Sequence, residues 1–312
     1  KINHKFHYDS HKQTQKWLAL HQAYSPARTD PDCAGVYEAG FTSAIAKLPP
    51  GPVHLIGLGC GGGQKDTTLL RLLRKAGRNV IYTPCDVSTA MVLVARQSAL
   101  SEISPNHCFP LVCDLATADD LKTALSASDP NSAQPQPVRL FTFFGMMPNF
   151  EPEIILPKLS GLICPEDILL LSANLAPGAD YGNGVQRVLP LYDNELTRDW
   201  LSTFLIDLGI EKTDGQVRFK VEDKPGIILL KRIAADFQFV RARILRLESE
   251  QFEFGPGDTI RLFFSYRHTP ELVPALLSQY GLSVHQRWIT ASSEEGVFLA
   301  GQKGTTESGS PR

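Results

Sequence analysis

The chain has 312 residues, of which 43% are hydrophobic and 21% are charged, and its net charge is −2. A chain of this length and composition forms one large globular domain with an insertion, or two smaller domains. The charge balance offers no basic surface for nucleic acid, and the longest apolar runs, such as residues 227–230, are far shorter than the roughly 20 residues of a membrane span. We therefore expect a cytoplasmic protein that acts on neither nucleic acid nor membranes.

The spacing of cysteine and histidine gives no indication of a metal site. No two cysteines form a C-x2-C pair, and Cys108 and Cys113 have no partner at ligand spacing. We expect the six cysteines to be free, buried thiols in a reducing compartment. His4, His7 and His11 lie at helical spacing in a polar stretch, which favours a solvated surface. The sequence therefore predicts no bound metal.

The first half of the chain alternates strands and helices. A helix over residues 35–47 is expected to end before Pro49-Pro50-Gly51, and Ser88 is expected to cap another helix. The apolar runs and their periodicity predict strands over 53–58, 80–85, 108–113, 138–144 and 168–173, and helices over 67–75 and 121–125. This alternation is typical of a parallel sheet that is covered on both faces.

The alternation changes between Pro177 and Gly257 and then resumes. The intervening part predicts a helix over 193–208 and strands over 216–221, 227–233 and 237–247. The part after Gly257 predicts a strand over 259–266, a helix over 270–280, and strands over 283–290 and 296–301. The last two strands are too close for a parallel crossover. We therefore expect residues 51–175 and 259–302 to form one sheet with an antiparallel last strand, and residues 303–312 to be disordered.

Glycines and two aspartates follow successive predicted strands. The strand over 53–58 ends in Gly59-x-Gly61-x-Gly63, where glycine lets the backbone approach a nucleotide-like ligand. Asp86 ends the next strand, where a carboxylate can accept hydrogen bonds from ribose hydroxyls, and Asp114 ends the third, where it can meet the amino group of adenine. All three lie at the carboxyl edge of a parallel sheet, which is where such sheets bind ligands. The pattern predicts a ligand that contains adenosine.

Two other interpretations explain parts of this pattern. Taken singly, Asp86 and Asp114 are better explained by helix capping or loop hydrogen bonds. A nicotinamide dehydrogenase also has a glycine turn followed by an acidic residue. However, the glycines of this chain are not spaced as G-x-G-x-x-G, and Asp114 has no role in that scheme. The three strand ends together favour the adenosine ligand.

Residues 54–70 resemble the first motif of class I methyltransferases and, more narrowly, that of the histidine-specific Nα-methyltransferases of ergothioneine biosynthesis. Four further segments agree with the family in order and spacing: residues 82–88, 143–152, 169–175 and 265–271. Two N-terminal segments, residues 5–9 and 24–29, are similar to that family's lid. The resemblance implies an α/β fold with a Rossmann-like, seven-stranded, mostly parallel sheet that binds S-adenosylmethionine. It also implies a lid segment over residues 1–50 and an inserted α+β substrate domain over residues 176–258.

The resemblance also assigns site residues. The cofactor-binding residues would be Gly59, Cys60, Gly61, Gly63, Lys65, Asp86, Val87, Asp114, Leu115, Phe144 and Gly145. The substrate pocket would contain Tyr24, Met147, Asn149, Phe263 and Ser265. Methyl transfer by in-line displacement needs mainly the alignment of donor and acceptor. We expect Asn149 to orient the acceptor, and Tyr24 or Tyr266 to hydrogen-bond it or relay its proton.

Three departures from the family pattern concern the chemistry. Gly57 stands where an acidic residue usually precedes the glycine turn. The loop before Asn149 is one residue shorter than in the family, and Phe263 stands where the family has a glutamate that grips the imidazole. Burying an unpaired imidazole N–H costs about 1–3 kcal/mol. We therefore expect a small amine-bearing substrate other than free histidine. The alternative is a non-catalytic module that binds S-adenosylmethionine or S-adenosylhomocysteine as a sensor or scaffold.

Overall fold

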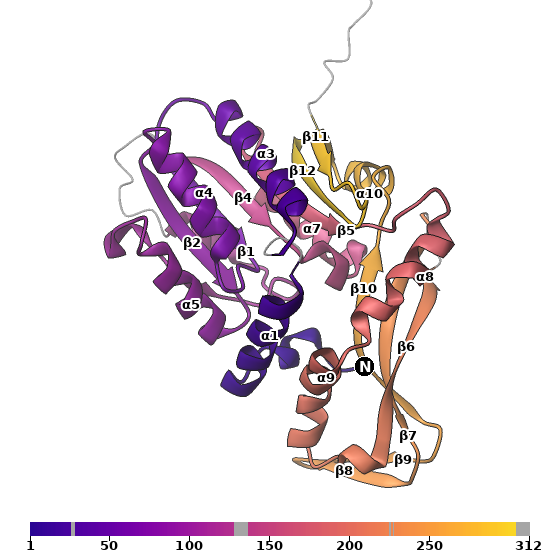
Figure 1. The fold of residues 1–312 in the computed structure, drawn as a ribbon. Coiled ribbons are helices and arrows are strands. Elements are labelled where there is room, and N and C mark those ends of the chain that lie inside the picture. Colours follow the sequence, from indigo (N-terminus) through magenta and orange to yellow (C-terminus); the bar gives the residue numbers. More distant parts are fainter. Residues whose placement is uncertain (26–28, 128–136, 225, 227, 304–312) are drawn as a thin grey trace, which may run out of the picture.

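The computed structural model describes residues 1–25, 29–127, 137–224, 226 and 228–303. The disordered tail expected over residues 303–312 lies, from residue 304 on, outside the described residues. A seven-stranded sheet forms the centre, in the order β11-β12-β5-β4-β1-β2-β3 (Figure 1). Its strands are β1 (Val53–Leu58), β2 (Val80–Asp86), β3 (Leu111–Val112), β4 (Val138–Phe143), β5 (Ile168–Asn174), β11 (Leu282–Ile289) and β12 (Glu295–Gln302).

The pairing of the strands confirms a seven-stranded, mostly parallel sheet whose last strand is antiparallel. Strands β1 to β5 are parallel to one another, whereas β12 is antiparallel to its two neighbours, β5 and β11. The helices of this part are α3 (Pro31–Lys47), α4 (Gln64–Lys75), α5 (Thr89–Ala99), α6 (Leu121–Ala127), α7 (Pro152–Leu162) and α10 (Leu272–Gln279). Ser88 caps α5 as expected, because its side chain accepts a hydrogen bond from the Met91 amide.

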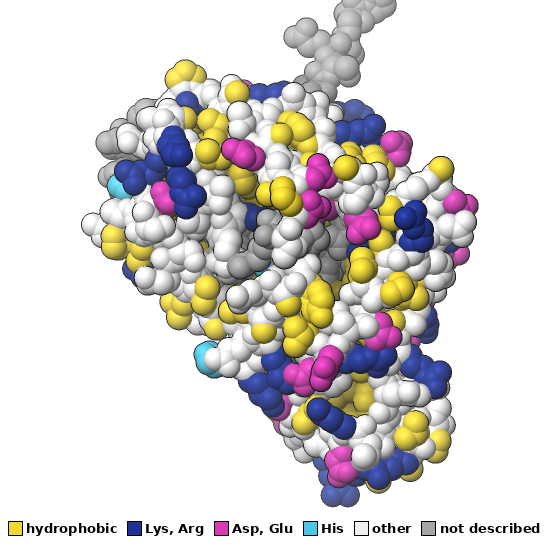
Figure 2. Space-filling model, viewed as in Figure 1, with side chains coloured by type: hydrophobic (Ala, Val, Ile, Leu, Met, Phe, Trp, Pro, Cys, Tyr) yellow, Lys and Arg dark blue, Asp and Glu magenta, His cyan; other side chains and the backbone are white. Residues whose placement is uncertain are grey.

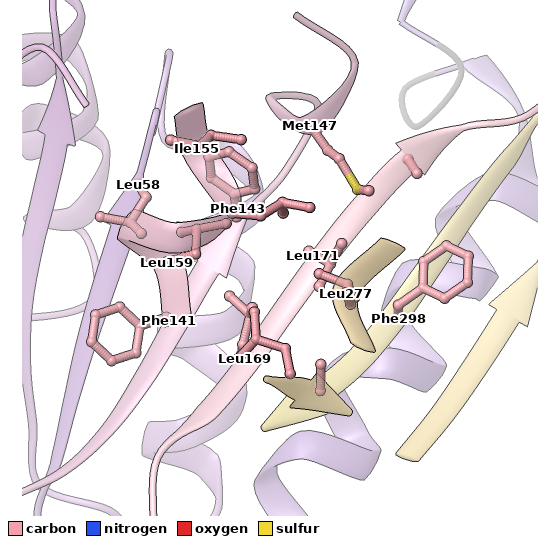
Figure 3. Close-up of a cluster of buried hydrophobic side chains, with 14 of the residues drawn as sticks. Leu58, Phe141, Phe143, Met147, Ile155, Leu159, Leu169, Leu171, Leu277 and Phe298 are labelled. Carbon is pink, nitrogen blue, oxygen red and sulfur yellow. The ribbon is translucent and has the colours of Figure 1, made fainter. Parts of the chain in front are cut away.

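Alternate residues of the central strands pack against opposite layers of helices, as the period of two in a strand requires. Phe141 and Leu169 belong to a cluster with α6, α7 and α10, part of which Figure 3 shows. Leu140 and Leu170 belong to a second cluster, with α3 and α4. Both faces of the sheet are therefore buried, and its free ligand-binding surface is the edge at which the parallel strands end.

The rest of the chain forms a second, smaller layer beside this core (Figure 1). It contains α8 (Tyr181–Tyr192), α9 (Glu195–Asp207), a three-stranded sheet and a hairpin. The sheet has the order β10-β7-β6, with β6 (Gly215–Lys224), β7 (Leu230–Phe239) and β10 (Thr259–Arg267), and the hairpin joins β8 (Arg243–Leu247) to β9 (Glu250–Phe254). Trp200 of α9 and Phe237 of β7 lie in one hydrophobic cluster that holds these elements together.

Three strand predictions are corrected. Residues 259–267 pair with β7 in the smaller sheet instead of continuing the main sheet, and only a bridge between Leu175 and His268 joins their end to β5. The segments expected over 227–233 and 237–247 are instead the single strand β7 and the separate strand β8, because Ala234, Ala235 and Asp236 continue the pairing without a turn. The strand expected over 108–113 is reduced to two paired residues after Pro110, which cannot donate to a sheet.

The N-terminal segment joins the two layers. It consists of the short helix η1 (His4–His7) and of α1 (His11–Tyr24), which starts with a capping box between Ser10 and Gln13. Lys12 and Lys16 of α1 form ion pairs with Asp207 and Asp199 of α9. On the opposite side of the helix, Thr14 Oγ1 lies 3.1 Å from Ser88 Oγ at the start of α5.

Candidate active site

A cavity of about 1230 Å³ lies at the carboxyl edge of the main sheet. Its walls come from the ends of the parallel strands, from the N-terminal segment and from the smaller layer. Ten of the predicted cofactor residues line it: Gly59, Cys60, Gly61, Lys65, Asp86, Val87, Asp114, Leu115, Phe144 and Gly145. The volume exceeds the roughly 300–1,000 Å³ of a pocket for one drug-sized ligand. The cavity therefore has room for two molecules side by side.

The glycine turn after β1 presents bare backbone to this cavity. Gly59 and Gly61 have φ angles of +67° and +52°, a region that residues with a side chain rarely adopt. Met146 lies against Gly59, and the Trp17 ring of α1 would lie 3.1 Å from a Cβ on Gly61. Gly63 has another role and does not line the cavity. It starts α4 with a φ of +72°, and a Cβ on it would lie 2.7 Å from the Cα atom of Ala95 in α5.

Asp86 holds the turn in place from the end of β2. Its two carboxylate oxygens accept hydrogen bonds from the amides of Gly61 and Ser88, each at 3.0 Å. The side chain is almost wholly buried, and burial raises its pKa, whereas the backbone amides lower it. Asp114 accepts a hydrogen bond from the Ala116 amide at 2.9 Å. Both aspartates thus combine a local backbone contact with a place in the cavity wall, and each oxygen retains lone pairs for hydroxyl or amino donors.

The carboxylate that is missing at Gly57 is supplied from α4. A Cβ on Gly57 would overlap the carboxylate of Asp66, which lines the cavity. Asp66 accepts hydrogen bonds from Tyr82 Oη at 2.7 Å and from Thr142 Oγ1 at 2.8 Å. Burial raises its pKa to about 6, although both hydrogen bonds act in the opposite direction. The sequence around Gly57 does not show that the carboxylate of Asp66 fills this space.

Lys65 lines the cavity and also contacts neighbouring elements of the fold. Its Nζ donates a hydrogen bond to Tyr37 Oη at 2.6 Å and lies 3.9 Å from the carboxylate of Glu295 in β12. It also lies 4.0 Å from the centre of the Tyr37 ring, and burial lowers its pKa. Phe144 packs edge-on against Tyr37 at 5.3 Å. The side chain of Lys65 therefore connects α4 to α3 and to the last strand of the sheet.

The predicted substrate residues separate into two groups. Tyr24, Asn149 and Phe263 line the cavity, with Tyr24 at its rim, where its side chain is 54% exposed. Met147 and Ser265 do not line it. Met147 points into the main hydrophobic core (Figure 3), so its neighbour Met146 takes the place in the cavity wall. Ser265 is buried beneath the wall, with its hydroxyl 2.9 Å from Tyr192 Oη.

Tyr266, expected to contact the acceptor, lies outside the cavity wall. Its hydroxyl donates a hydrogen bond to Glu151 at 2.6 Å and accepts one from Arg232 at 3.2 Å. Because successive residues of a strand face opposite sides, Tyr266 packs in the main core while Arg267 reaches the cavity. The prediction that Tyr266 relays a proton is corrected: Glu151, to which it is bound, lines the cavity in its place.

Four aromatic side chains, His4, Phe150, Trp200 and Phe263, form a wall of the cavity. Of these, only Phe263 was expected from the sequence as a pocket residue. His4 lies 5.0 Å from Tyr8 and 6.1 Å from Phe150, measured between ring centres. Phe263 lies 5.9 Å from Trp200. The expectation that the N-terminal histidines form a solvated surface is wrong for two of them. His7 is fully buried, with Nε2 2.7 Å from the Leu262 carbonyl oxygen, and burial lowers the pKa of His4 to about 3.

Two classes of site find no support among the described residues. No group of three or more His, Cys, Asp or Glu side chains could hold a metal ion. None of the helices is long and apolar enough to cross a membrane. On the face shown in Figure 2, lysines and arginines lie beside aspartates and glutamates. That face therefore presents mixed charge.

A glycine turn and two strand-end aspartates, on a seven-stranded sheet with one reversed strand, are the arrangement of an S-adenosylmethionine-dependent methyltransferase, and the chain is of this class. Residues 18–188 match the model of the family described as histidine-specific, S-adenosylmethionine-dependent methyltransferases. This match covers more than half of the 312 residues. The chain belongs to that family. No curated protein sequence matches it.

Solved structures of methyltransferases are similar to this chain at low identity. Magnesium protoporphyrin IX methyltransferase from Synechocystis PCC 6803, with bound S-adenosylhomocysteine, is 13% identical with a TM-score of 0.46, over 94% of this chain and 95% of that one. The CcbJ methyltransferase from Streptomyces caelestis is 13% identical with a TM-score of 0.44, over 87% of this chain and 96% of that one. The family assignment rests on the family model and not on these scores.

Proposed function

We propose that the chain transfers the methyl group of S-adenosylmethionine to a small amine-bearing molecule, an amino acid or a derivative, other than free histidine. The observation that carries this proposal is the wall formed by Phe263, Trp200, Phe150 and His4 in the cavity that also holds the glycine turn. The proposal includes a division into a lid (1–50), a cofactor core and an inserted substrate domain. Because β10 pairs with β7, we extend the insertion to Arg267.

The residues at the strand ends fit the cofactor. Gly59 and Gly61 have no side chain, so their backbone is open to a ligand at the cavity wall. Asp86 and Asp114 have lone pairs there that can accept hydrogen bonds from the ribose hydroxyls and the adenine amino group. Trp17 would cover the ligand from α1. When bound, S-adenosylmethionine supplies an electrophilic methyl group on a sulfonium. The buried carboxylates of Asp66 and Asp86 in the cavity wall are also compatible with the positive charge of this sulfonium.

Asn149 is the residue proposed to orient the amine. It lines the cavity in the short helix η3 (Met147–Asn149), directly after the loop that contains Gly145 and Met146. The structure records no hydrogen bond for its side-chain amide, so the carbonyl oxygen is available to a ligand N–H. Alignment of an uncharged amine is the main requirement of an in-line displacement. Tyr24, at the rim, would complete the contact when the N-terminal segment is closed.

The same wall argues against histidine as the acceptor. The carboxylate of Glu151 lines the cavity, but it already accepts hydrogen bonds from Tyr266, Lys224 and Arg232. The phenyl ring of Phe263 offers no acceptor for an imidazole N–H. An imidazole buried there would lose about 1–3 kcal/mol for each unpaired N–H. An apolar or aromatic side chain would lose nothing and would gain contact area.

The test is an amine panel, assayed by release of S-adenosylhomocysteine and by the mass of the product. It contains free histidine beside aromatic and aliphatic amino acids. The proposal expects methylation of at least one of these, with kcat/KM for histidine at least tenfold lower. Preferential trimethylation of histidine would overturn the substrate assignment. Tight binding of S-adenosylhomocysteine with no turnover of any amine would favour the non-catalytic module, which no observation at present supports.

A further inference from the structure

Arg267 is a buried arginine without an acidic partner. It ends β10, is 7% exposed and lines the cavity. Its Nη1 donates hydrogen bonds to the backbone oxygens of Leu175, at 3.0 Å, and Glu294, at 3.3 Å. Its Nη2 donates to Tyr192 Oη at 2.9 Å. These three hydrogen bonds leave Nε with no hydrogen-bond partner. Its hydrogen-bond partners are all neutral oxygens, and its guanidinium carbon lies 5.2 Å from the centre of the Tyr192 ring, so no carboxylate compensates its charge.

Three other partly buried arginines of this chain are compensated by carboxylates. Arg139 is paired with Asp167, Arg232 with Glu222 and Glu151, and Arg261 with Asp236 and Glu222. These three side chains are each 18–19% exposed. Arg267 is more deeply buried, yet the part of the chain that the structure describes places no carboxylate oxygen within 4.0 Å of it. A buried charge without a charged partner is unfavourable. An anion that enters the cavity beside Arg267 would supply that partner.

The side chains around Arg267 form a network of hydrogen-bond donors. Asn174 Nδ2 lies 3.4 Å from both Tyr192 Oη and Ser265 Oγ, and these two hydroxyls lie 2.9 Å apart. Tyr192 accepts from Arg267 and from Asn174, so its own proton is directed to Ser265. Asn174 and Arg267 line the cavity, so the amide N–H groups and the guanidinium are the donors at this end of it, with Ser265 buried behind them. A carboxylate, which only accepts hydrogen bonds, matches these donors.

The apolar wall continues from this polar end. Phe263 and Arg267 lie on the same face of β10, and both side chains approach Tyr192. The guanidinium carbon of Arg267 is 5.2 Å from the centre of the Tyr192 ring, and the Phe263 ring lies 6.3 Å from that of Tyr192 and 5.9 Å from that of Trp200. One small molecule beside Tyr192 could place a carboxylate at Arg267 and an apolar ring against Phe263. Asn149, proposed to hold the amine, lines the same cavity.

We propose that Arg267 binds the carboxylate of the methyl acceptor, and that the acceptor is an α-amino acid with a large aromatic side chain. This inference rests on the proposed function. The cofactor also carries a carboxylate, and it is the other source of this chemistry. The experiment must therefore separate the affinity for the cofactor from the affinity for the acceptor.

The experiment measures binding by calorimetry, with saturating S-adenosylhomocysteine present, so it does not depend on turnover. The ligands are L-tryptophan and L-phenylalanine and their decarboxylated amines, tryptamine and phenethylamine. The wild type should bind each amino acid at least tenfold more tightly than its amine. In Arg267→Met the amino acids should weaken by about 10- to 100-fold, whereas the amines should not change. Arg267→Lys should restore part of the preference.

Two controls make the outcomes distinct. Arg246→Met removes an exposed arginine on β8, distant from the cavity wall, and should change no affinity. The Kd for S-adenosylhomocysteine, measured alone, should stay within twofold in Arg267→Met; a large rise would assign Arg267 to the cofactor and overturn the inference. Equal affinity of the wild type for amino acid and amine, or binding of neither, would also overturn it, even if Arg267→Met did not fold. Binding with this preference but no methylation would refute the proposed function and leave the assignment of Arg267 intact.

Discussion

The carboxylate of Asp66 occupies the space into which a side chain at position 57 would project. The two residues come from different elements, β1 and α4, and the carboxylate is held there by Tyr82 and Thr142. A carboxylate at the end of β1 would collide with the one from α4. The glycine at position 57 and the acid at position 66 therefore depend on each other: the absence of a side chain at one position makes room for the carboxylate from the other.

Gly57→Ala should destabilise the protein, because the new methyl group must displace a buried carboxylate that has two hydrogen bonds. Overpacking of this kind costs about 1–3 kcal/mol. Chemical denaturation measures the loss. The matched control is Gly35→Ala in α3, where a Cβ would meet nothing within 4 Å and the substitution should stabilise the helix by about 0.5–1 kcal/mol. Equal effects at both positions would contradict the collision.

Asp66 should make the stability depend on pH. Burial raises its pKa to about 6 in the folded protein, above the value of 3.8 for an exposed aspartate. The folded state then holds the proton more tightly than the unfolded state, so stability falls as the pH rises from about 4 to 6 and is level above that window. Asp66→Asn removes this loss. The free energy of unfolding of the wild type, relative to Asp66→Asn, should fall by about 2–3 kcal/mol between pH 4 and pH 7. A difference that is constant with pH would refute the raised pKa.

Asp86→Ala should weaken cofactor binding. The substitution removes the oxygens proposed for the ribose hydroxyls and also leaves the Gly61 and Ser88 amides without their acceptor. Calorimetry should show a loss of about 1.5–3 kcal/mol in the affinity for S-adenosylmethionine, the range for hydrogen bonds to a charged group. Asp119→Ala is the control, because Asp119 is exposed and pairs with Lys158 outside the cavity. An unchanged affinity would remove Asp86 from the site.

Phe263→Gln should improve methylation of histidine relative to the wild type. The amide gives an imidazole N–H an acceptor where the phenyl ring gives none, and one buried hydrogen bond is worth about 1 kcal/mol. We expect kcat/KM for histidine to rise by about fivefold while that for aromatic amino acids falls. The control Phe252→Gln, at an exposed phenylalanine of β9, should leave kcat/KM unchanged for both histidine and the aromatic amino acids. A parallel fall for all substrates would mean that Phe263 only supports the fold.

Local patterns predicted most of the main sheet, because β1, β2, β4 and β5 are compact apolar runs bounded by turn residues. The glycine turn and both aspartates could be placed for the same reason, since they follow strand ends directly. The helices α7 and α8 were not predicted, because each contains an internal proline and their burial comes from tertiary packing. Strand β10 was placed in the wrong sheet because its apolar sequence would fit either.

The rest of the site depended on contacts between distant residues. The pairing of Gly57 with Asp66, the replacement of Met147 by Met146 and the missing partner of Arg267 are properties of the assembled fold. Residue spacing along the chain contains none of this information. Phe263 was found because it departs from a family pattern, whereas Trp200 and His4 lie in segments that offered no such comparison. The aromatic wall could only be seen once the N-terminal segment and α9 were brought together.

Helix α1 touches the glycine turn through Trp17 and is fastened to α9 through Lys12 and Lys16. We expect a ligand beneath Trp17 to be enclosed by a helix that is also attached to the smaller layer. Exchange of spent cofactor for fresh cofactor would then involve movement of α1 and separation of these two lysine–aspartate pairs. Both pairs are partly exposed, and ions in solution screen such pairs. We therefore expect the rate of cofactor exchange to depend on ionic strength.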